Sequence, residues 1–251
     1  MIKSAIVLAA GFGSRLMPLT KDRPKCLVPV GGIPIVFRTL DILERLGVEE
    51  AVMVLGHKEE AVRAALGDQR GKVSIRYVIN EEYGITNTMY SLLLSGETMR
   101  SGAYVIEGDC VLSEAVLEAL VSATPADRSF WVVDHWNEHS SGCRLTTSAN
   151  ATRIIGQDII REVGTPFSHG EHHKSVGLLR LNADQGRLLE EKLQEEADKD
   201  NRKVYYDDVF GMNVEEFQIH ALNIHPMRWM EVDDAADLAI AEDLFKPGSS
   251  A

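Results

Sequence analysis

Four cationic side chains follow a glycine-rich turn near the start of the chain. They are Arg15, Lys21, Arg23 and Lys25. Asp22 is the single acid among them, so residues 11–25, the basic loop, carry a local charge of +3, four bases minus one acid. Gly11 and Gly13 let the backbone approach a ligand closely and present its N–H groups. Cationic side chains and accessible N–H groups are complementary to phosphate oxygens, so we expect the basic loop to bind a polyphosphate.

Carboxylates occur at two later places that could face the basic loop. Asp109 follows the apolar run 103–106, which is typical of a buried strand. Ligands of open α/β sheets collect outside the carboxyl ends of the strands, so Asp109 should lie beside the basic loop. Glu231 and Asp233 alternate near the end of the chain and should point to the same side of a strand. Carboxylate oxygens suit Mg²⁺, and we assign Asp233 as a ligand of that ion, with Glu231 in a supporting role.

Two further acids next to Asp233 have a structural interpretation. Asp234 and Asp237 lie where they would cap a closing helix at about 234–245. Capping accounts for these two residues and leaves Asp233 available for the site.

Strand-like and helix-like segments alternate through the first half of the chain. Strands are predicted at 5–10, 51–55, 73–79 and 103–106, and helices at 34–46, 58–66 and 87–99. Alternation of this kind is typical of right-handed βαβ units, in which helices cover both faces of a parallel sheet.

The pattern changes beyond about residue 129. Strands are predicted at 129–134, 144–147, 154–160 and 175–181, and helices at 183–199 and 234–245. These segments indicate partly antiparallel structure joined to the same sheet. We therefore predict one domain over 1–246, with a nucleotide-binding half at 1–128, an acceptor-binding half at 129–246 and a flexible tail at 247–251.

Composition excludes several classes of protein. The net charge is −12, so nucleic acid is not an expected partner. Three cysteines, Cys26, Cys110 and Cys143, form neither a disulfide framework nor a zinc motif. No apolar run approaches the ~20 residues of a membrane span, and no signal peptide is evident, so we expect a cytoplasmic protein with no membrane partner.

The basic loop matches neither of two familiar phosphate-binding loops. It lacks the Gly-Lys-Ser/Thr ending of the Walker loop, and Leu16 stands where the dinucleotide fingerprint needs a small residue. The run Leu8-Ala-Ala-Gly11-x-Gly13-x-Arg15-x-x-Pro18-x-Thr20-x-x-x-Pro24-Lys25 instead resembles the signature of the nucleotidyltransferase superfamily. That superfamily includes nucleotide-sugar pyrophosphorylases and bacterial cytidylyltransferases. The resemblance implies a Rossmann-like, three-layer αβα fold of the α/β class with a mixed, mainly parallel central sheet.

The resemblance also assigns roles to individual residues. It implies that Lys25 contacts the α-phosphate and Arg15 the β- and γ-phosphates, as the catalytic pair, and that Asp109 holds Mg²⁺ together with Asp233. The implied nucleotide-binding residues are Leu8, Ala10, Gly11, Phe12, Gly13, Ser14, Arg15, Lys25, Asn80, Thr86, Asn87 and Ser91.

Later motifs favour one branch of the superfamily. The Glu-Lys-Pro and Asp-x-Gly-Thr motifs common in the sugar-nucleotide enzymes are replaced here by Glu162-Val-Gly and Asp233-Asp-Ala-Ala. The Glu231-x-Asp233-x-x-x-Asp237 ending and the run Tyr205-Tyr-Asp-Asp208 are similar to those of phosphocholine and phosphonate cytidylyltransferases. The implied acceptor-binding residues are Glu231, Tyr206, Asp207, Asp208, Arg144 and Lys174.

Aromatic and acidic side chains suggest how an ammonium group on the acceptor is held. Ring faces and nearby carboxylates attract such a cation. The available groups are Tyr205, Tyr206, Trp131, Trp136, Asp207 and Asp208. Ser141-Gly-Cys-Arg144 stands where choline-type enzymes tend to have another aromatic residue, which favours a head group smaller than trimethylammonium.

The expected reaction joins CMP from CTP to a small phosphate or phosphonate acceptor and releases pyrophosphate. Phosphocholine, 2-aminoethylphosphonate and hydroxyalkylphosphonates all fit as acceptors. The alternatives are a sugar-1-phosphate nucleotidyltransferase that uses UTP or dTTP, a nucleotide-binding regulator without turnover, and a glycosyltransferase on a similar fold. The sequence leaves the oligomeric state open, a homodimer included.

Overall fold

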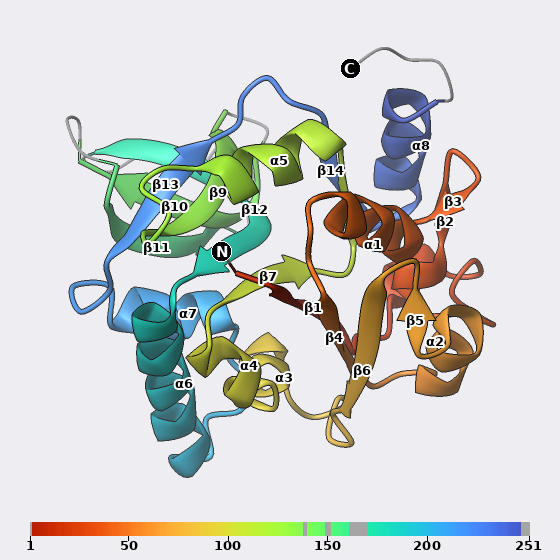
Figure 1. Cartoon of the computed structure of the whole chain (residues 1–251), viewed down its shortest axis with the longest axis horizontal. Coiled ribbons are helices and arrows are strands. Elements are labelled where there is room, and N and C mark those ends of the chain that lie inside the picture. The colour runs from red at the N-terminus through yellow and green to blue at the C-terminus, as the bar shows by residue number, and fades with distance from the viewer. Residues whose placement is uncertain (1, 138–139, 149–151, 161–169, 247–251) are drawn as a thin grey trace.

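A mixed β-sheet forms the centre of the molecule (Figure 1). The computed structural model describes residues 2–137, 140–148, 152–160 and 170–246. In spatial order, its main path contains β11 (Ile154–Ile160), β10 (Gly142–Thr147), β12 (Glu171–Leu181), β7 (Ala103–Glu107), β1 (Ser4–Ala9), β4 (Glu50–Leu55), β6 (Val73–Ile79) and β5 (Gln69–Arg70). Off this path, β9 (Ser129–His135) pairs with β12 and with β13 (Ile219–Asn223).

Helices cover both faces of the sheet. They are α1 (Ile35–Arg45), α2 (Glu59–Leu66), α3 (Thr88–Leu93), α4 (Gly96–Arg100), α5 (Glu114–Ser122), α6 (Ala183–Asp198), α7 (Tyr206–Met212) and α8 (Ala235–Leu244). Short elements complete the described structure: η1 (Ser14–Leu16), η2 (Lys25–Leu27), the pair β2 (Pro29–Val30) and β3 (Ile33–Pro34), and the pair β8 (Cys110–Leu112) and β14 (Trp229–Glu231).

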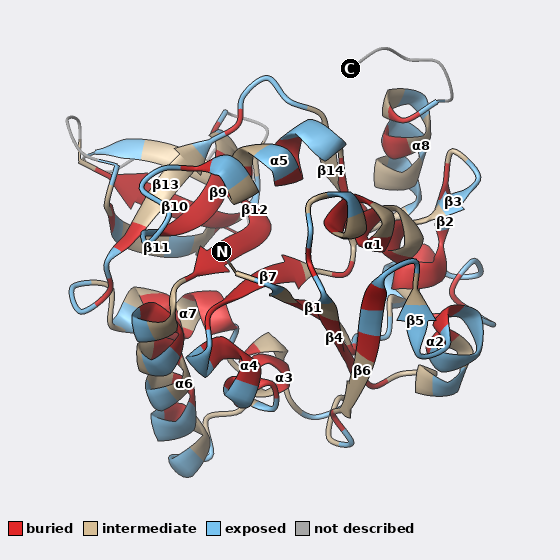
Figure 2. Cartoon of the chain, viewed as in Figure 1, coloured by how far each residue is buried: buried red, intermediate tan, exposed pale blue. Residues whose placement is uncertain are grey.

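Alternating side chains of the central strands supply two separate cores. On β1, Ala5 and Val7 pack in a cluster with residues of α1, α2 and α5, whereas Ile6 and Leu8 pack in one with residues of α3, α4, α6 and α7. Strands buried on both faces need apolar residues at every position, which explains the continuous apolar run of β1. Figure 2 shows these buried strands between helices whose outer faces are exposed.

The three-layer α/β fold and the mixed sheet are confirmed. Parallel pairing joins β7, β1, β4 and β6, and also β9 and β13. The strands β12, β10 and β11 pair antiparallel with their neighbours, so the sheet is partly rather than mainly parallel. Both predicted halves of the chain contribute strands to this sheet, and the tail at 247–251 lies outside the described residues.

Three helical segments differ from expectation. The single helix predicted at 87–99 is two short helices, because the chain turns between Leu93 and Gly96. The helix α5 was not predicted. The helix α7 was not predicted either: Tyr205 is its N-cap residue, and Asp208 accepts a 3.1 Å hydrogen bond from the backbone N–H of Tyr205.

Candidate active site

Three cavities meet at the carboxyl ends of β1 and β7. The loop cavity, about 350 Å³, is lined by Leu8, Ala9, Gly11, Phe12, Gly13, Ser14, Arg15, Lys25, Cys26, Gly108, Asp109 and Asp233. The α3 cavity, about 160 Å³, is lined by Leu8, Ala10, Gly11, Asn80, Tyr83, Thr86, Asn87, Thr88, Ser91, Glu107 and Asp109. The β12 cavity, about 510 Å³, has among its lining residues Arg15, Lys174, Tyr205, Asp207, Glu231 and Asp233. Asp109 lines all three cavities.

The glycine turn after β1 fixes the basic loop. Gly13 has a φ of +60°, in the left-handed region that favours glycine. A Cβ atom there would lie 3.1 Å from Cβ of Lys25 and 3.2 Å from a methyl group of Thr20. The hydroxyl of Thr20 donates a 2.8 Å hydrogen bond to the carbonyl of Gly13. This glycine therefore allows Lys25 to pack directly on the turn.

Lys25 lies between the two carboxylates that were assigned to the metal. Its Nζ atom is 2.7 Å from Oδ2 of Asp109 and 2.7 Å from Oδ1 of Asp233. A guanidinium nitrogen of Arg15 lies 2.9 Å from the same oxygen of Asp233. The structure thus brings together all four residues predicted to act on phosphate and metal.

Opposite charges control protonation at this cluster. Burial alone would lower the pKa of Lys25, but Asp109 and Asp233 outweigh it and raise that pKa well above its ordinary value. Burial likewise opposes ionisation of Asp233, but Lys25 and Arg15 outweigh it and lower the pKa of that carboxyl. Lys25 stays cationic and Asp233 anionic throughout the neutral range.

The strands β8 and β14 position the carboxylates. Glu231 is the register partner of Cys110, and the backbone N–H of Val232 donates a 3.0 Å hydrogen bond to the carbonyl of Asp109. Carboxylate oxygens of Asp109, Glu231 and Asp233 all lie within 4.8 Å of one another. Three hard oxygen donors at this spacing fit Mg²⁺.

The neighbouring acids cap α8. Oδ1 of Asp234 accepts hydrogen bonds from the backbone N–H groups of Ala236 and Asp237, at 2.8 and 3.1 Å. Asp237 accepts in return from the backbone N–H groups of Asp233 and Asp234. The capping interpretation of Asp234 and Asp237 is correct, and it orients the backbone that carries Asp233.

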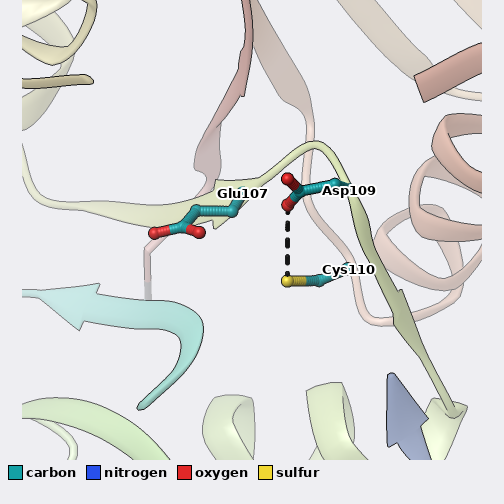
Figure 3. A group of neighbouring side chains, drawn as sticks. All are labelled: Glu107, Asp109 and Cys110. Carbon is teal, nitrogen blue, oxygen red and sulfur yellow. Dashed lines mark hydrogen bonds between the residues drawn. The ribbon is translucent and has the colours of Figure 1, made fainter. Parts of the chain in front are cut away.

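A second group of possible ligands suits Mg²⁺ less well. Glu107, Asp109 and Cys110 lie close together where β7 ends (Figure 3), with Sγ of Cys110 at 3.7 Å from Oδ1 of Asp109. Burial raises the pKa of the Cys110 thiol well above its ordinary value. A neutral thiol is a poor ligand for a hard cation. All three cysteines of the chain are free and buried.

All twelve residues predicted to bind the nucleotide line the loop cavity or the α3 cavity. In the α3 cavity, the amide of Asn80 donates 3.0 Å hydrogen bonds to the hydroxyls of Thr86 and Ser91. Oδ1 of Asn87 accepts from the backbone N–H of Thr88 and caps α3. A fixed set of polar groups therefore lines the α3 cavity.

The predicted acceptor-binding residues divide into two groups. Lys174, Asp207 and Glu231 line the β12 cavity, where Nζ of Lys174 lies 3.0 Å from Oε2 of Glu231. The side chains of Tyr206, Asp208 and Arg144 do not line it.

The reason is the helical course of α7 and the register of β10. Tyr206 is fully buried, stacks on the buried Trp131 and donates a 2.6 Å hydrogen bond to Oε1 of Glu107. Asp208 caps α7. Arg144 pairs with Asp158 at 3.0 Å and lies over the ring of Trp136. These rings belong to the core, and they do not form a cage around the cavity.

Buried acids in the β12 cavity were only partly anticipated. Burial, reinforced by the charges of Asp207, Asp109 and Glu231, raises the pKa of Glu107 well above its ordinary value. Sequence reasoning missed Glu107, although an acid at the end of an apolar strand was an available signal. Burial and then the charge of Asp208 raise the pKa of Asp207 to about 7, and its Oδ1 atom is buried without a hydrogen-bond partner in the described structure.

A basic loop, clustered carboxylates and adjoining polar cavities lie together at the carboxyl ends of β1 and β7, where the ligands of α/β sheets collect. The chain belongs to the family of MobA-like NTP transferase domains, whose model matches residues 5–230.

Individual relatives agree with that family. The chain is 34% identical to CMP-5'-(3-aminopropyl)phosphonate synthase of Streptomyces rubellomurinus over 97% of its length, but it spans only 39% of that longer protein. It is 28% identical to 2-aminoethylphosphonate cytidylyltransferase of Lancefieldella rimae, over 94% of this chain and 90% of that one. The solved structure of CTP:phosphocholine cytidylyltransferase from Streptococcus pneumoniae matches 98% of this chain and 100% of its own, with 21% identity and a TM-score of 0.80.

The helices of the described residues are all too short or too polar to cross a lipid bilayer.

We predict that Lys25→Ala lowers turnover of the nucleotide by ~10²-fold, because one preorganised charge next to the phosphates is lost. Pyrophosphate release at saturating nucleotide measures the effect. Lys21→Ala is the matched control, since Lys21 is exposed on the same loop and lines none of the three cavities. Equal turnover of Lys25→Ala and Lys21→Ala would show that Lys25 does not contribute to the chemical step.

Proposed function

We propose that this protein is a magnesium-dependent cytidylyltransferase that joins CMP from CTP to a small aminoalkylphosphonate and releases pyrophosphate. The observation that carries the proposal is the β12 cavity, in which Lys174 and the unpartnered carboxylate oxygen of Asp207 offer opposite charges to one small molecule. The family and the activities named for two relatives support the nucleotide and the class of acceptor.

The nucleotide occupies the loop cavity and the α3 cavity in this proposal. Backbone N–H groups of the glycine turn, Arg15 and Lys25 bind the triphosphate, as expected for phosphate at an exposed turn. The base lies against Asn80, Thr86 and Ser91, whose mutual hydrogen bonds fix the polar groups that would face it.

The acceptor attacks from the β12 cavity. One phosphonate oxygen forms a bond to the α-phosphorus of CTP in line with the bond that breaks, and pyrophosphate leaves with the electron pair. The phosphonate is already an anion near neutral pH, so the step requires no general base. Arg15 and Asp233 line both the loop cavity and the β12 cavity, which puts the two reactants on either side of them.

Charge neutralisation is the main contribution of the protein to this step. Lys25, held by Asp109 and Asp233, offers a fixed cation beside the phosphates. Asp109, Asp233 and Glu231 are the residues that would hold Mg²⁺, which when bound neutralises developing negative charge.

The lining of the β12 cavity favours a primary ammonium over a trimethylammonium. Tyr205 is its one aromatic side chain in the described structure, whereas Glu107, Asp207 and Glu231 supply carboxyl groups. A primary ammonium donates hydrogen bonds to such oxygens, but a quaternary ammonium has no N–H and relies on ring faces. This difference selects aminoalkylphosphonates from the acceptors that the sequence leaves open.

A matrix of donors and acceptors tests the proposal directly. Pyrophosphate release is measured with CTP, UTP and dTTP, each against 2-aminoethylphosphonate, 3-aminopropylphosphonate, phosphocholine and glucose 1-phosphate, with and without Mg²⁺. We expect turnover with CTP, Mg²⁺ and the aminoalkylphosphonates. Preferred turnover of glucose 1-phosphate with UTP or dTTP would replace the proposal with the sugar-nucleotide alternative, and no turnover in any pair would favour a non-catalytic regulator.

Asp207→Asn separates binding of the ammonium group from the chemistry. We expect kcat/KM for 2-aminoethylphosphonate to fall at least tenfold, because the variant lacks the charge that pairs with the amine. The value for 2-hydroxyethylphosphonate should change less than twofold, since this acceptor has no cation. A similar loss with both acceptors would show that Asp207 has a structural role.

The pKa of Asp207, about 7, predicts a pH dependence specific to amine acceptors. Below pH 7 the carboxyl is mostly neutral, and above it the carboxylate pairs with an amine that stays protonated to about pH 10. The ratio of kcat/KM for 2-aminoethylphosphonate to that for 2-hydroxyethylphosphonate should therefore rise about tenfold from pH 6 to pH 8. The ammonium group lowers the phosphonate pKa of one acceptor relative to the other, so each phosphonate is titrated separately and its ionisation is divided out of this ratio. A flat ratio, or the same rise in Asp207→Asn, would contradict the assignment.

A further inference from the structure

A fourth cavity, of about 580 Å³, shares no lining residue with the three cavities of the active site. We call it the distal cavity. It is lined by Arg38, Ile42, Arg45, Leu112, Ser113, Glu114, Ala115, Pro226, Met227, Arg228 and Phe245. These residues come from α1, α5 and the segments at the ends of β8, β14 and α8. Figure 1 shows α1, α5, β14 and α8 on the same side of the molecule.

The distal cavity is cationic although the chain as a whole carries a charge of −12. Three arginines face a single acid of the lining, Glu114, which pairs with Arg45 through two contacts of 2.9 Å. The guanidinium groups of Arg38 and Arg228 lie over the same ring, Phe245, at 5.1 and 5.9 Å from its centre. Burial, and to a smaller extent the charge of Arg228, lowers the pKa of Arg38, and the nearby Glu242 opposes this shift.

Backbone groups hold both guanidinium groups, and two buried polar atoms nearby, on Arg38 and Ser113, lack a hydrogen-bond partner among the described residues. Backbone carbonyls of Val30 and Leu244 hold Arg38 and Arg228 at 3.0 and 3.1 Å. Nε of Arg38 is buried without a partner in the described structure, as is the hydroxyl of Ser113. Ser113 is the N-cap residue of α5, where the helix dipole adds to the attraction of an anion.

We propose that the distal cavity binds a small organic phosphate or phosphonate and that its occupancy adjusts the active site. The two arginines and the Ser113 hydroxyl would hold the anionic group, since guanidinium forks match phosphate oxygens. The apolar side chains of Ile42, Leu112, Met227 and Phe245 would cover the organic part.

Three elements join the distal cavity to the three carboxylates. Asp109 precedes β8, and Ser113 follows it in the cavity lining. Arg228 precedes β14, which ends at Glu231. The helix α8 begins two residues after Asp233 and ends next to Phe245. A displacement at the cavity would therefore reach each carboxylate through a single rigid element.

Side-chain packing reinforces this connection. Phe245 belongs to a buried apolar cluster that also contains Leu16, Val111 and Val232. Leu16 follows Arg15 in the chain, and Val232 lies between Glu231 and Asp233. A ligand that moves the Phe245 ring would alter the packing beneath the residues that bind phosphate and metal.

Titration calorimetry with phenyl phosphate tests the site on the full chain. Ala115→Trp fills the distal cavity from an exposed helix position, and Arg38→Gln removes one charge. We expect both changes to weaken binding at least tenfold. Ala65→Trp, at an exposed position of α2 outside the cavity, should leave binding unchanged, and so should Lys174→Ala in the β12 cavity.

Kinetics test the coupling. Phenyl phosphate should change KM for CTP or kcat at least twofold in the wild-type protein and in Ala65→Trp, but not in Ala115→Trp. No binding, binding that Ala115→Trp leaves intact, or binding lost in Lys174→Ala would overturn the site. Binding without a kinetic change would overturn the regulation. Because calorimetry needs no turnover, the site is tested even if the proposed reaction fails.

Discussion

The ion cluster of Lys25 with Asp109 and Asp233 is the interaction on which the site depends. It joins the basic loop, the end of β7 and the segment after β14, which are far apart in the sequence. Carboxylates this close repel one another unless a cation lies between them. The same charges that make the cluster stable keep Lys25 protonated and hold the carboxylate oxygens where a divalent cation can bind. Stability of the site and its capacity to neutralise phosphate charge thus have one electrostatic cause.

The parallel and the antiparallel strands of the sheet line different cavities of the site. The parallel strand β1 ends at the loop cavity and the α3 cavity, and β6 ends at the α3 cavity. The antiparallel strands β12 and β10 extend the sheet past β7 and form a wall of the β12 cavity. Buried acids line that cavity. Lys174 compensates part of their charge, and burial raises the pKa of Glu107, which favours its neutral form.

Much of the fold, and the set of residues that line the loop cavity, could be predicted from the sequence. Apolar strands that alternate with helices specify the three layers of the fold. Gly13 and Lys25 lie close together in the sequence, so the motif of the basic loop can be identified without knowledge of tertiary contacts. The acceptor side was predicted less well. Whether Tyr206 faces a ligand or the core depends on where α7 begins, and a helix start moves each following side chain by about 100°. The pKa of Glu107 depends on neighbours from other elements, which no local pattern reveals.

Asp109 borders every compartment of the active site, whereas Lys174, Asp207 and Tyr205 border only the β12 cavity. In the proposed reaction, substitutions along β12 and at the start of α7 would therefore change the acceptor and leave the residues proposed to bind the nucleotide in place. A fold in which different residues line the two sides of the site can acquire new products through mutations on one side alone. Protein engineers could vary the residues of the β12 cavity in the same way.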